Sequence, residues 1–329
     1  MDVLLSSDDN YAPLLGVTVY SLLKNNQKDF DSINIYILDG GISEKNKEKL
    51  KFICNEFSVK TDLNFIMYDN LENILGIEIK ATRALATYSR LFAGSLLNNN
   101  IDKILYLDCD ALVTDSFKTL WEIELDKYYC AAVLDAGPKY INTFLELPES
   151  NEHFNAGMLL INLKLWRDDN LEKKFLEYII SKNGNVFHND QGVINVICQG
   201  KILKLNPKYN ILSPFFEVEY EDVLKFYNIT EYYTKDIIEN AINNPVFIHL
   251  TQFVHGRPWF KNAENHPLRN LFDSYASKTP FKNTIYTEDK RHFKGKLLSF
   301  TYKYIPYPLI CNMFKVYEVI ITKTKKGSI

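Results

Sequence analysis

The sequence of 329 residues predicts an α/β fold with a mainly parallel central sheet. Three observations lead to this prediction. Short runs with strand character alternate with helical patterns over the first third of the chain, as in βαβ units. A hydrophobic content of 46% with 24% charged residues is typical of a globular domain and excludes disordered, collagen-like and coiled-coil chains. No stretch of about 18 uninterrupted apolar residues occurs, so no transmembrane helix is expected.

The alternation can be followed element by element. Strands are predicted at 3–7, 33–38, 63–68 and 103–107, and helices at 14–24, 44–56 and 87–97. In such sheets ligands bind outside the carboxyl ends of the strands, where the strand order reverses. Two of these ends are polar: Ser6-Ser7-Asp8-Asp9-Asn10-Tyr11 and Asp108-Cys109-Asp110. There is no GxGxxG fingerprint and no P-loop, so a dinucleotide site and a P-loop nucleotide site are not expected.

The charge is small overall but unevenly distributed. A formal net charge of −3 argues against a protein that mainly coats nucleic acid. Residues 290–329 nevertheless hold nine Lys or Arg, one acid and seven aromatic residues. This shift predicts a main domain, 1–285, and a basic aromatic tail, 286–329. The tail suits contact with an anionic membrane surface; the alternative is a C-terminal helix packed on the body with its lysines in solvent.

The cysteines and the amino terminus indicate the compartment. Five cysteines lie scattered without CxxC spacing, at positions 54, 109, 130, 198 and 311, and are expected to be buried reduced thiols. The first residues lack a basic region followed by an apolar run, so no cleaved signal is expected. We therefore expect a cytoplasmic protein, associated peripherally with the inner face of the membrane through its tail.

Asp108 and Asp110 form the sharpest candidate site. They follow the apolar run Ile104-Leu105-Tyr106-Leu107, and residues i and i+2 of an extended chain project to the same side. Two carboxylates at a strand end suit a divalent cation that keeps positions open for phosphate oxygens. The alternative is that these aspartates only cap the next turn.

A second apolar run, Val246-Phe247-Ile248, ends at His249. An imidazole added to two carboxylates shifts the preferred ion from magnesium towards manganese, although a lone histidine is more often structural. Arg257, before Pro258-Trp259, offers a bidentate donor for phosphate, or is part of an ordinary packing corner.

Two further segments are candidates for holding a sugar. In Asn155-Ala156-Gly157, small residues after an amide allow a ligand close to the backbone, or mark a strand start with a bulge glycine. In Asp190-Gln191, a carboxylate and an amide precede a helical pattern; the alternative is that Asp190 is a helix N-cap.

Together these motifs, from residue 1 to about 280, resemble glycosyltransferase family 8, and among its members the bacterial lipooligosaccharide and lipopolysaccharide α-galactosyl- and glucosyltransferases. The resemblance implies the Rossmann-like GT-A fold in one domain, with helices on both faces of the sheet. It implies a manganese ion, or magnesium, and UDP-galactose or UDP-glucose as donor. The metal ligands would be Asp108, Asp110 and His249. Donor contacts would come from Ser6, Asp8, Asn10, Tyr11, Arg90, Asp108, Cys109, Asp110, Asn155, Ala156, Gly157, Asp190, Gln191 and Arg257.

The resemblance also implies a mechanism, with Gln191 and Asp190 as catalytic residues. A hexose would pass to a glycan or glycolipid acceptor by front-face attack, with a diphosphate oxygen taking the acceptor's proton. Gln191 would stabilise the cationic sugar and Asp190 would orient donor hydroxyls. The chain departs from the family pattern His-x-x-Gly-x-x-Lys-Pro-Trp, because Gln252 and Arg257 replace the glycine and the lysine and two residues are added.

Two other functions would use parts of the same sequence. A haloacid dehalogenase-like phosphatase would use Asp108 as nucleophile, but Leu112 stands where Thr or Val is expected. Its downstream acidic pair would have to be Asp168-Asp169, which begins a helical pattern. A non-catalytic binder of nucleotide sugars or glycans could have kept the same fold.

Overall fold

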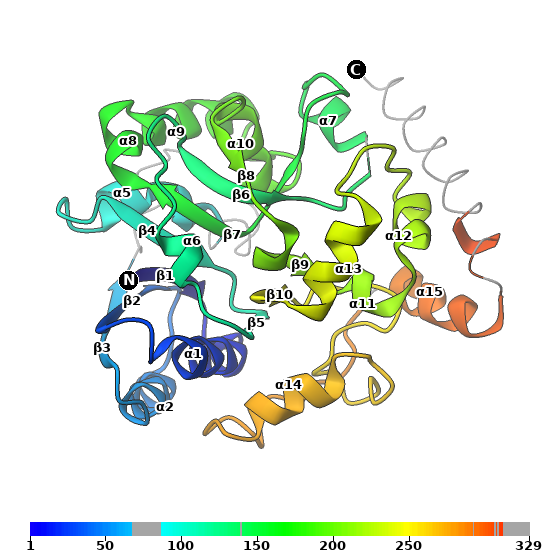
Figure 1. Ribbon diagram of the computed structural model, residues 1–329, viewed down its shortest axis with the longest axis horizontal. Helices are drawn as coiled ribbons and strands as arrows, with labels where there is room; N and C mark the ends of the chain where they lie inside the picture. The colour runs from blue at the N-terminus through cyan, green and yellow to red at the C-terminus, as the bar shows by residue number, and fades with distance from the viewer. Residues whose placement is uncertain (68–86, 139, 292, 306, 308, 312–329) are drawn as a thin grey trace.

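The computed structural model describes residues 1–67, 87–138, 140–291, 293–305, 307 and 309–311 (Figure 1). The end of the predicted strand 63–68 and the last part of the predicted tail lie outside these residues.

The predicted parallel sheet is present and is continued by antiparallel pairing. Strands β1 (Asp2–Ser7), β2 (Ser32–Asp39), β3 (Lys60–Met67) and β4 (Lys103–Leu107) run parallel in the order β3-β2-β1-β4. Beyond β4 follow β7 (Phe154–Asn162), antiparallel to both neighbours, then β6 (Cys130–Leu134) and β8 (Ile202–Lys204). The order reverses between β1 and β4, so the polar ends of these two strands lie at the switch point where open α/β sheets bind ligands.

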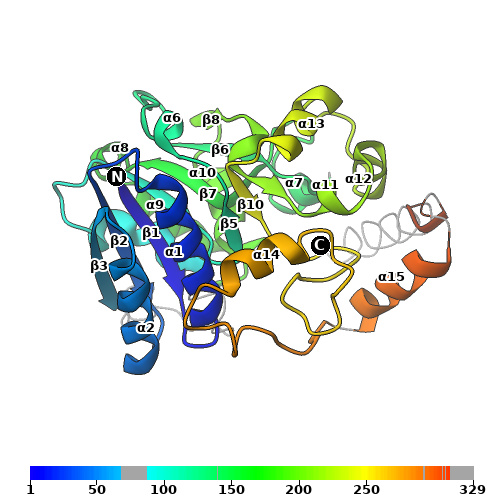
Figure 2. The same cartoon turned by 60° about the horizontal axis from the view of Figure 1, so that its bottom comes forward.

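Helices cover both faces of this sheet (Figures 1 and 2). On one face lie α1 (Ala12–Asn26) and α2 (Glu44–Asn55), and on the other lie α8 (Leu163–Asp168), α9 (Leu171–Ser181) and α10 (Asn189–Ile197). The predicted helix 87–97 is interrupted: a 3-10 turn, η1 (Ser89–Phe92), precedes α5 (Ala93–Leu96). At the junction Phe92 has φ −106° and ψ 20°, outside the α-helical range, which breaks the helix there.

A second, small sheet brings the two halves of the site together. In it β10 (Phe247–His249) pairs antiparallel with β5 (Ala111–Val113) and parallel with β9 (Ile211–Leu212). His249 is directly opposite Ala111 in this register. The other elements are α6 (Lys118–Trp121), α7 (Tyr140–Phe144), η2 (Pro207–Tyr209), α11 (Pro214–Glu217), α12 (Tyr220–Phe226), α13 (Lys235–Asn243), α14 (Arg269–Ala276) and α15 (Phe293–Tyr304).

The described part of the tail packs on the body through a cluster of its own. Tyr307, Ile310 and Cys311 are buried against Phe226 and the loop residues Phe253 and Val254. The guanidinium of Arg291 donates to the carbonyl of Phe253 at 3.3 Å, and the Ser299 hydroxyl donates to that of Val254. The tail therefore contacts the loop that leads to Arg257.

All five cysteines are buried and free, as predicted. Within the part of the chain that the structure describes, none of the helices combines the length and apolar character needed to cross a membrane.

Candidate active site

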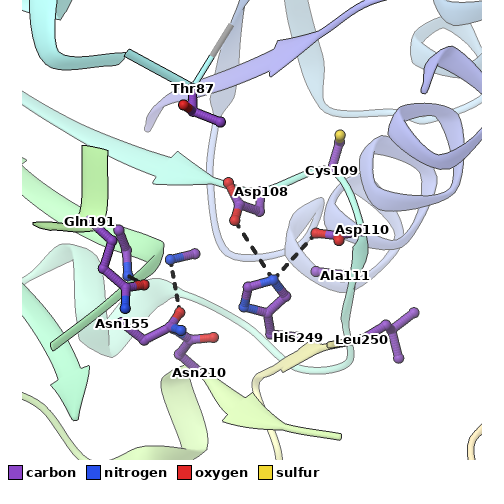
Figure 3. A network of polar contacts seen from close by, with 12 residues as sticks. Thr87, Asp108, Cys109, Asp110, Ala111, Asn155, Gln191, Asn210, His249 and Leu250 are labelled. Carbon is purple, nitrogen blue, oxygen red and sulfur yellow. Dashed lines mark hydrogen bonds and ion pairs between the residues drawn. The ribbon is translucent and has the colours of Figure 1, made fainter. Parts of the chain in front are cut away.

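Asp108 and Asp110 lie in the connection between β4 and β5, at the switch point of the sheet. Thr18 of α1 fixes the backbone of this connection. Its hydroxyl lies 2.8 Å from the carbonyl oxygen of Cys109 and 2.9 Å from that of Ala111. Both aspartate side chains project to the same side, whereas that of Cys109 points away from them (Figure 3). Burial raises the pKa of the Cys109 thiol well above its usual value, so this sulfur stays protonated.

His249 completes a group of three potential metal ligands. Its Nε2 lies 3.6 Å from Asp108 Oδ2 and 3.3 Å from Asp110 Oδ1 (Figure 3). The ligand atoms of the three residues all lie within 4.8 Å of one another. Two carboxylate oxygens and one imidazole nitrogen at this spacing fit a single divalent cation.

Two arginines bind the other oxygen of each carboxylate. Arg90 Nη1 lies 3.0 Å from Asp108 Oδ1, and Arg257 Nη1 lies 2.8 Å from Asp110 Oδ2. Arg257 also donates to the carbonyl of Leu250. Each aspartate is thus oriented by one arginine while its second oxygen faces His249, so the three ligands are positioned before any ion binds.

The protonation of these groups supports a cation site. Burial opposes the ionisation of Asp110, but Arg257 and His249 outweigh it and hold the pKa of Asp110 below its usual value. Burial likewise opposes protonation of His249, yet the bond to Asp110 raises its pKa overall. The Asp110 carboxylate and the His249 imidazole therefore each stabilise the charged form of the other.

The amides of Asn155, Gln191 and Asn210 form a network that adjoins this group (Figure 3), and the Asp135 carboxylate belongs to the same network. Asn155 accepts from the Asn210 amide at 2.8 Å and donates to Asp135 at 3.0 Å. Gln191 accepts from the backbone N–H of Ala156 at 3.1 Å and donates to Asp135 Oδ2 at 2.9 Å. Asn155, Ala156 and Gln191, all predicted for the sugar pocket, are therefore brought together.

Asp190 is not the N-cap that one interpretation of the sequence suggested. It is the second residue of α10, whose N-cap is His188, and its carboxylate lies 3.1 Å from Arg90 Nε. Burial raises the pKa of Asp190 to about 6, although Arg90 opposes this shift. Arg90 thus bonds both Asp108 and Asp190.

The loop after β1 is close by, since β1 and β4 are adjacent parallel strands. Ser6 Oγ lies 3.2 Å from Ser89 Oγ, next to Arg90 in η1. Asp8 accepts from the backbone N–H of Tyr11 at 2.9 Å, so part of its carboxylate stabilises the turn into α1. Asn10 and Tyr11 are exposed, with 39% of the Tyr11 surface accessible.

The acidic pair considered for a phosphatase is engaged elsewhere. Asp168 and Asp169 lie at the C-terminal end of α8, where they bond Lys164 and Tyr129. They do not face Asp108 from a strand end, and the phosphatase interpretation loses the acids it requires.

Three residues of the site were not predicted. Tyr106 donates to Asp108 Oδ1 at 2.7 Å and lies under the Arg90 guanidinium, 4.0 Å from the ring centroid. Its position two residues before Asp108, on the same side of β4, could have indicated this role. Asp135 and Asn210 carry no such signal. Asp135 follows β6, which pairs with β7, and Asn210 precedes β9, which pairs with β10, and only these pairings bring the two residues near Asn155.

Gly157 lies where the register of β6 and β7 shifts, since Ala131 pairs with Leu160 and Val133 with Asn155, and it also lies against His249. A Cβ atom at this position would overlap the imidazole ring of His249. We therefore expect Gly157→Ala to displace His249 and to weaken metal binding by roughly 10–100-fold, the range for groups that position ligands. Calorimetric titration with Mn²⁺ measures this, with Gly295→Ala on α15, where a Cβ atom would meet only ordinary van der Waals contacts, as the control. An unchanged metal affinity would contradict the assigned role of His249.

The loop that carries Arg257 is held by a buried carboxylate. Glu217 Oε2 accepts from the backbone N–H of His255 at 2.8 Å and lies 3.0 Å from its Nδ1. His266 Nδ1 accepts from the Leu268 N–H at 3.0 Å, so its Nε2 carries the proton and faces Glu217 Oε1 at 3.5 Å. Burial opposes ionisation of Glu217, but these donors lower its pKa below the ordinary 4.5.

This arrangement predicts a pH-dependent stability. Because the pKa is lowered in the folded state, Glu217 stabilises the protein above pH 4.5, and this contribution is lost as the pH falls through the folded-state pKa. We expect Glu217→Gln to lower the free energy of unfolding by about 1.5–3 kcal/mol at pH 7 and by less in acid. Urea unfolding across this pH range measures it, with exposed Glu264→Gln as control. If Glu217→Gln lowers the free energy of unfolding equally at every pH, the charge on Glu217 does not hold this loop.

Known proteins are similar to this chain in sequence and in fold. A family model described as Glycosyl transferase family 8 matches residues 2–263. A Haemophilus influenzae protein is 33% identical over 220 residues, which span 64% of this chain and 63% of that protein, slightly under two thirds of its length. The lipopolysaccharide 1,2-glucosyltransferase of Escherichia coli K12 is 27% identical over 286 residues, 86% of this chain and 79% of that enzyme.

A solved structure shares the architecture. The galactosyltransferase LgtC, crystallised in complex with donor and acceptor sugar analogs, superposes with a TM-score of 0.68. It is 26% identical, and the match covers 85% of this chain and 96% of that one.

Proposed function

Because the chain belongs to glycosyltransferase family 8, we propose that it transfers galactose or glucose from a UDP-sugar to a glycan or glycolipid acceptor, with retention of the α configuration. The single observation that carries this proposal is the convergence of Asp108, Asp110 and His249 at the switch point of the sheet, with two arginines on the outer oxygens. The acceptor class follows the similarity to the lipopolysaccharide 1,2-glucosyltransferase. The proposal assigns catalysis to residues 1–285.

The chemical problem is charge that develops on the departing diphosphate while the sugar becomes cationic. A divalent ion, manganese or alternatively magnesium, held by Asp108, Asp110 and His249 would neutralise that developing charge. Arg257 adds a fixed cation beside Asp110. Ser6, Asp8, Asn10 and Tyr11 would hold the nucleoside at the adjacent end of β1, with Cys109 contributing backbone groups.

The cationic sugar requires a neutral or negative neighbour that does not attack it. Gln191 is held at both ends of its amide, by the N–H of Ala156 and by Asp135. An amide is a poor nucleophile, so this geometry supports front-face attack in which a diphosphate oxygen takes the acceptor's proton. Asn155 and Asp190 would orient donor hydroxyls, with Gly157 leaving room for His249.

Slow hydrolysis of UDP-sugars in the presence of Mn²⁺ tests the proposal. A panel of UDP-sugars is scored by release of UDP, and saturation-transfer NMR reports which donors bind. Faster release of UDP from UDP-galactose or UDP-glucose than from the other UDP-sugars supports a hexosyltransferase. Binding without release would instead indicate a non-catalytic nucleotide-sugar binder, and neither binding nor release would refute the proposal.

We further propose that the tail, 286–329, attaches the enzyme to an anionic membrane surface and so places it on the inner face of the cytoplasmic membrane. Tyr307 and Ile310 are buried against the body, whereas Leu297, Phe300 and Tyr304 of α15 are 45–64% exposed. The tail thus has one side anchored to the domain and another that leaves large apolar groups in solvent, among basic residues.

Replacing Leu297, Phe300 and Tyr304 together by Ser is expected to weaken binding to phosphatidylglycerol-containing vesicles at least tenfold, since each buried side chain is worth roughly 1.5–3 kcal/mol. Co-sedimentation of the full chain measures it, and pure phosphatidylcholine vesicles test the charge requirement. Phe52→Ser on α2, where the side chain is 56% exposed, is the matched control. Equal binding by the triple variant and the control would exclude the tail as the attachment site.

A further inference from the structure

A second group of metal-ligating side chains lies on the other side of Gln191. The side chains of Asp135, His153 and His188 have potential ligand atoms that all lie within 4.8 Å of one another. They come from the end of β6, the residue before β7 and the residue before α10, so none of them is shared with the group of Asp108, Asp110 and His249.

The amide nitrogen of Gln191 occupies the middle of this group. Its Nε2 lies 2.9 Å from Asp135 Oδ2, 3.2 Å from His153 Nε2 and 3.3 Å from His188 Nδ1. The orientation of the amide is set by Oε1, which accepts from the Ala156 N–H. This nitrogen has two hydrogens for three neighbouring atoms, so one of the three is left without a donor from Gln191.

One imidazole nitrogen of each histidine faces the centre of this group, Nε2 of His153 and Nδ1 of His188. His153 Nδ1 is buried and has no hydrogen-bond partner among the described residues. The proton of the neutral ring can reside on this nitrogen, which leaves the Nε2 lone pair facing the group.

The three side chains are held in place by the surrounding structure. The Asp135 N–H donates to the His153 carbonyl at 2.8 Å, and Asp135 Oδ1 accepts from Asn155 at 3.0 Å. His188 has φ 58° and its ring stacks on Phe187, with centroids 4.8 Å apart and planes 15° apart. Such support favours a site formed before the ligand arrives.

We propose that Asp135, His153 and His188 form a second, inhibitory site for a borderline divalent cation such as Zn²⁺, which binds in place of the Gln191 amide nitrogen. Two neutral imidazoles and one carboxylate are a donor set typical of zinc, whereas magnesium and calcium prefer oxygen ligands. Zinc–ligand bonds are about 2.0–2.2 Å long, so each ligand atom has to approach the position of the amide nitrogen by roughly 1 Å.

Occupation of this site changes Gln191. The cation and the amide nitrogen compete for Asp135 Oδ2, so Gln191 must turn away from Asp135 when the ion binds. Its carbonyl then no longer keeps its fixed position on the Ala156 N–H. The inhibitory part of the inference rests on the proposed function, while the binding of the ion does not.

Titration of the full chain with Co²⁺, a spectroscopic substitute for Zn²⁺, tests binding without an activity assay. In the double variant Asp108→Asn, Asp110→Asn the first site is removed, and we expect one Co²⁺ d–d spectrum to remain that Zn²⁺ displaces. Adding either His188→Gln or Asp135→Asn should abolish that spectrum. The inference is overturned if the double variant binds no Co²⁺, or if the spectrum survives both of the added substitutions.

Inhibition is tested with the wild-type chain saturated with Mn²⁺. Micromolar Zn²⁺ is expected to reduce UDP release by the wild-type chain at least tenfold. For His188→Gln, UDP release with Zn²⁺ is expected to differ less than twofold from UDP release by the same variant without Zn²⁺. Equal inhibition of both proteins would overturn the regulatory role. If no protein releases UDP under any condition, the proposed function fails while the Co²⁺ result still decides the metal site.

Discussion

Replacement of Asp110 by Asn is expected to reduce Mn²⁺-dependent UDP-sugar turnover by roughly 100- to 1000-fold, the scale seen when a group that stabilises the developing charge is removed. The asparagine keeps the size of the side chain but removes one anionic ligand and the partner of Arg257. Because Asp110 is ionised at neutral pH, owing to Arg257 and His249, the full charge of this ligand is lost. Turnover at saturating donor measures the effect, and Mn²⁺ titration separates lost metal affinity from lost catalysis.

A control variant distinguishes this effect from a general loss of acid residues. Asp102 is exposed and lies just before β4, at the opposite end of the strand from the site. Asp102→Asn is therefore expected to leave turnover unchanged. Retention of most activity by Asp110→Asn would refute the assignment of the metal site.

Replacement of Arg90 by Met is expected to lower the free energy of unfolding by about 3–5 kcal/mol, because it leaves buried carboxylates without their countercharge. Arg90 is 6% exposed and bonds Asp108, Asp190 and the carbonyl of Ala156, at 3.0, 3.1 and 3.0 Å. It also stacks on Tyr106. Its loss therefore affects the η1 turn, β4, β7 and α10 together. Urea unfolding of the metal-free protein at pH 7 measures this change.

A second variant shows whether the cause is charge. In Arg90→Met the carboxylates of Asp108 and Asp190 both lose their cation. Adding Asp190→Asn removes one of these two charges, so the double variant should be more stable than Arg90→Met alone. Lys173→Met, on the exposed face of α9, controls for the substitution of a basic residue by Met. A loss of under 1 kcal/mol for Arg90→Met, or a double variant that is less stable than Arg90→Met, would contradict the proposed electrostatic role.

The loop after β10 is two residues longer than the family pattern, and it contacts both the site and the tail. Where the family pattern is shorter, Phe253 and Gly256 form an isolated bridge that turns the chain, and Gly256 has φ 86°. The turn still returns Arg257 to Asp110. Phe253 and Val254 of this loop pack in one cluster with Tyr307 and Ile310 of the tail. The loop therefore contacts the site through Arg257 and the tail through these two residues.

The sequence by itself determined the features that depend on neighbouring residues. Strand and helix periodicity predicted β1 to β4 and the helices α1 and α2, and the spacing of Asp108 and Asp110 placed both carboxylates on one side of the chain. It also predicted buried free cysteines. These properties follow from local geometry, in which residue i and i+2 of a strand share a face whatever the rest of the chain does.

Only the tertiary structure decided which distant groups meet. His249 reaches the two aspartates because β10 pairs with β5 in the register that places it opposite Ala111, and a shift by one residue would turn its side chain to the other face. Asp135, His153 and His188 carry no joint signal in the sequence, yet three separate chain segments bring them around Gln191. Ion pairs, pKa shifts and metal sites depend on distances between such segments, and packing alone sets these distances.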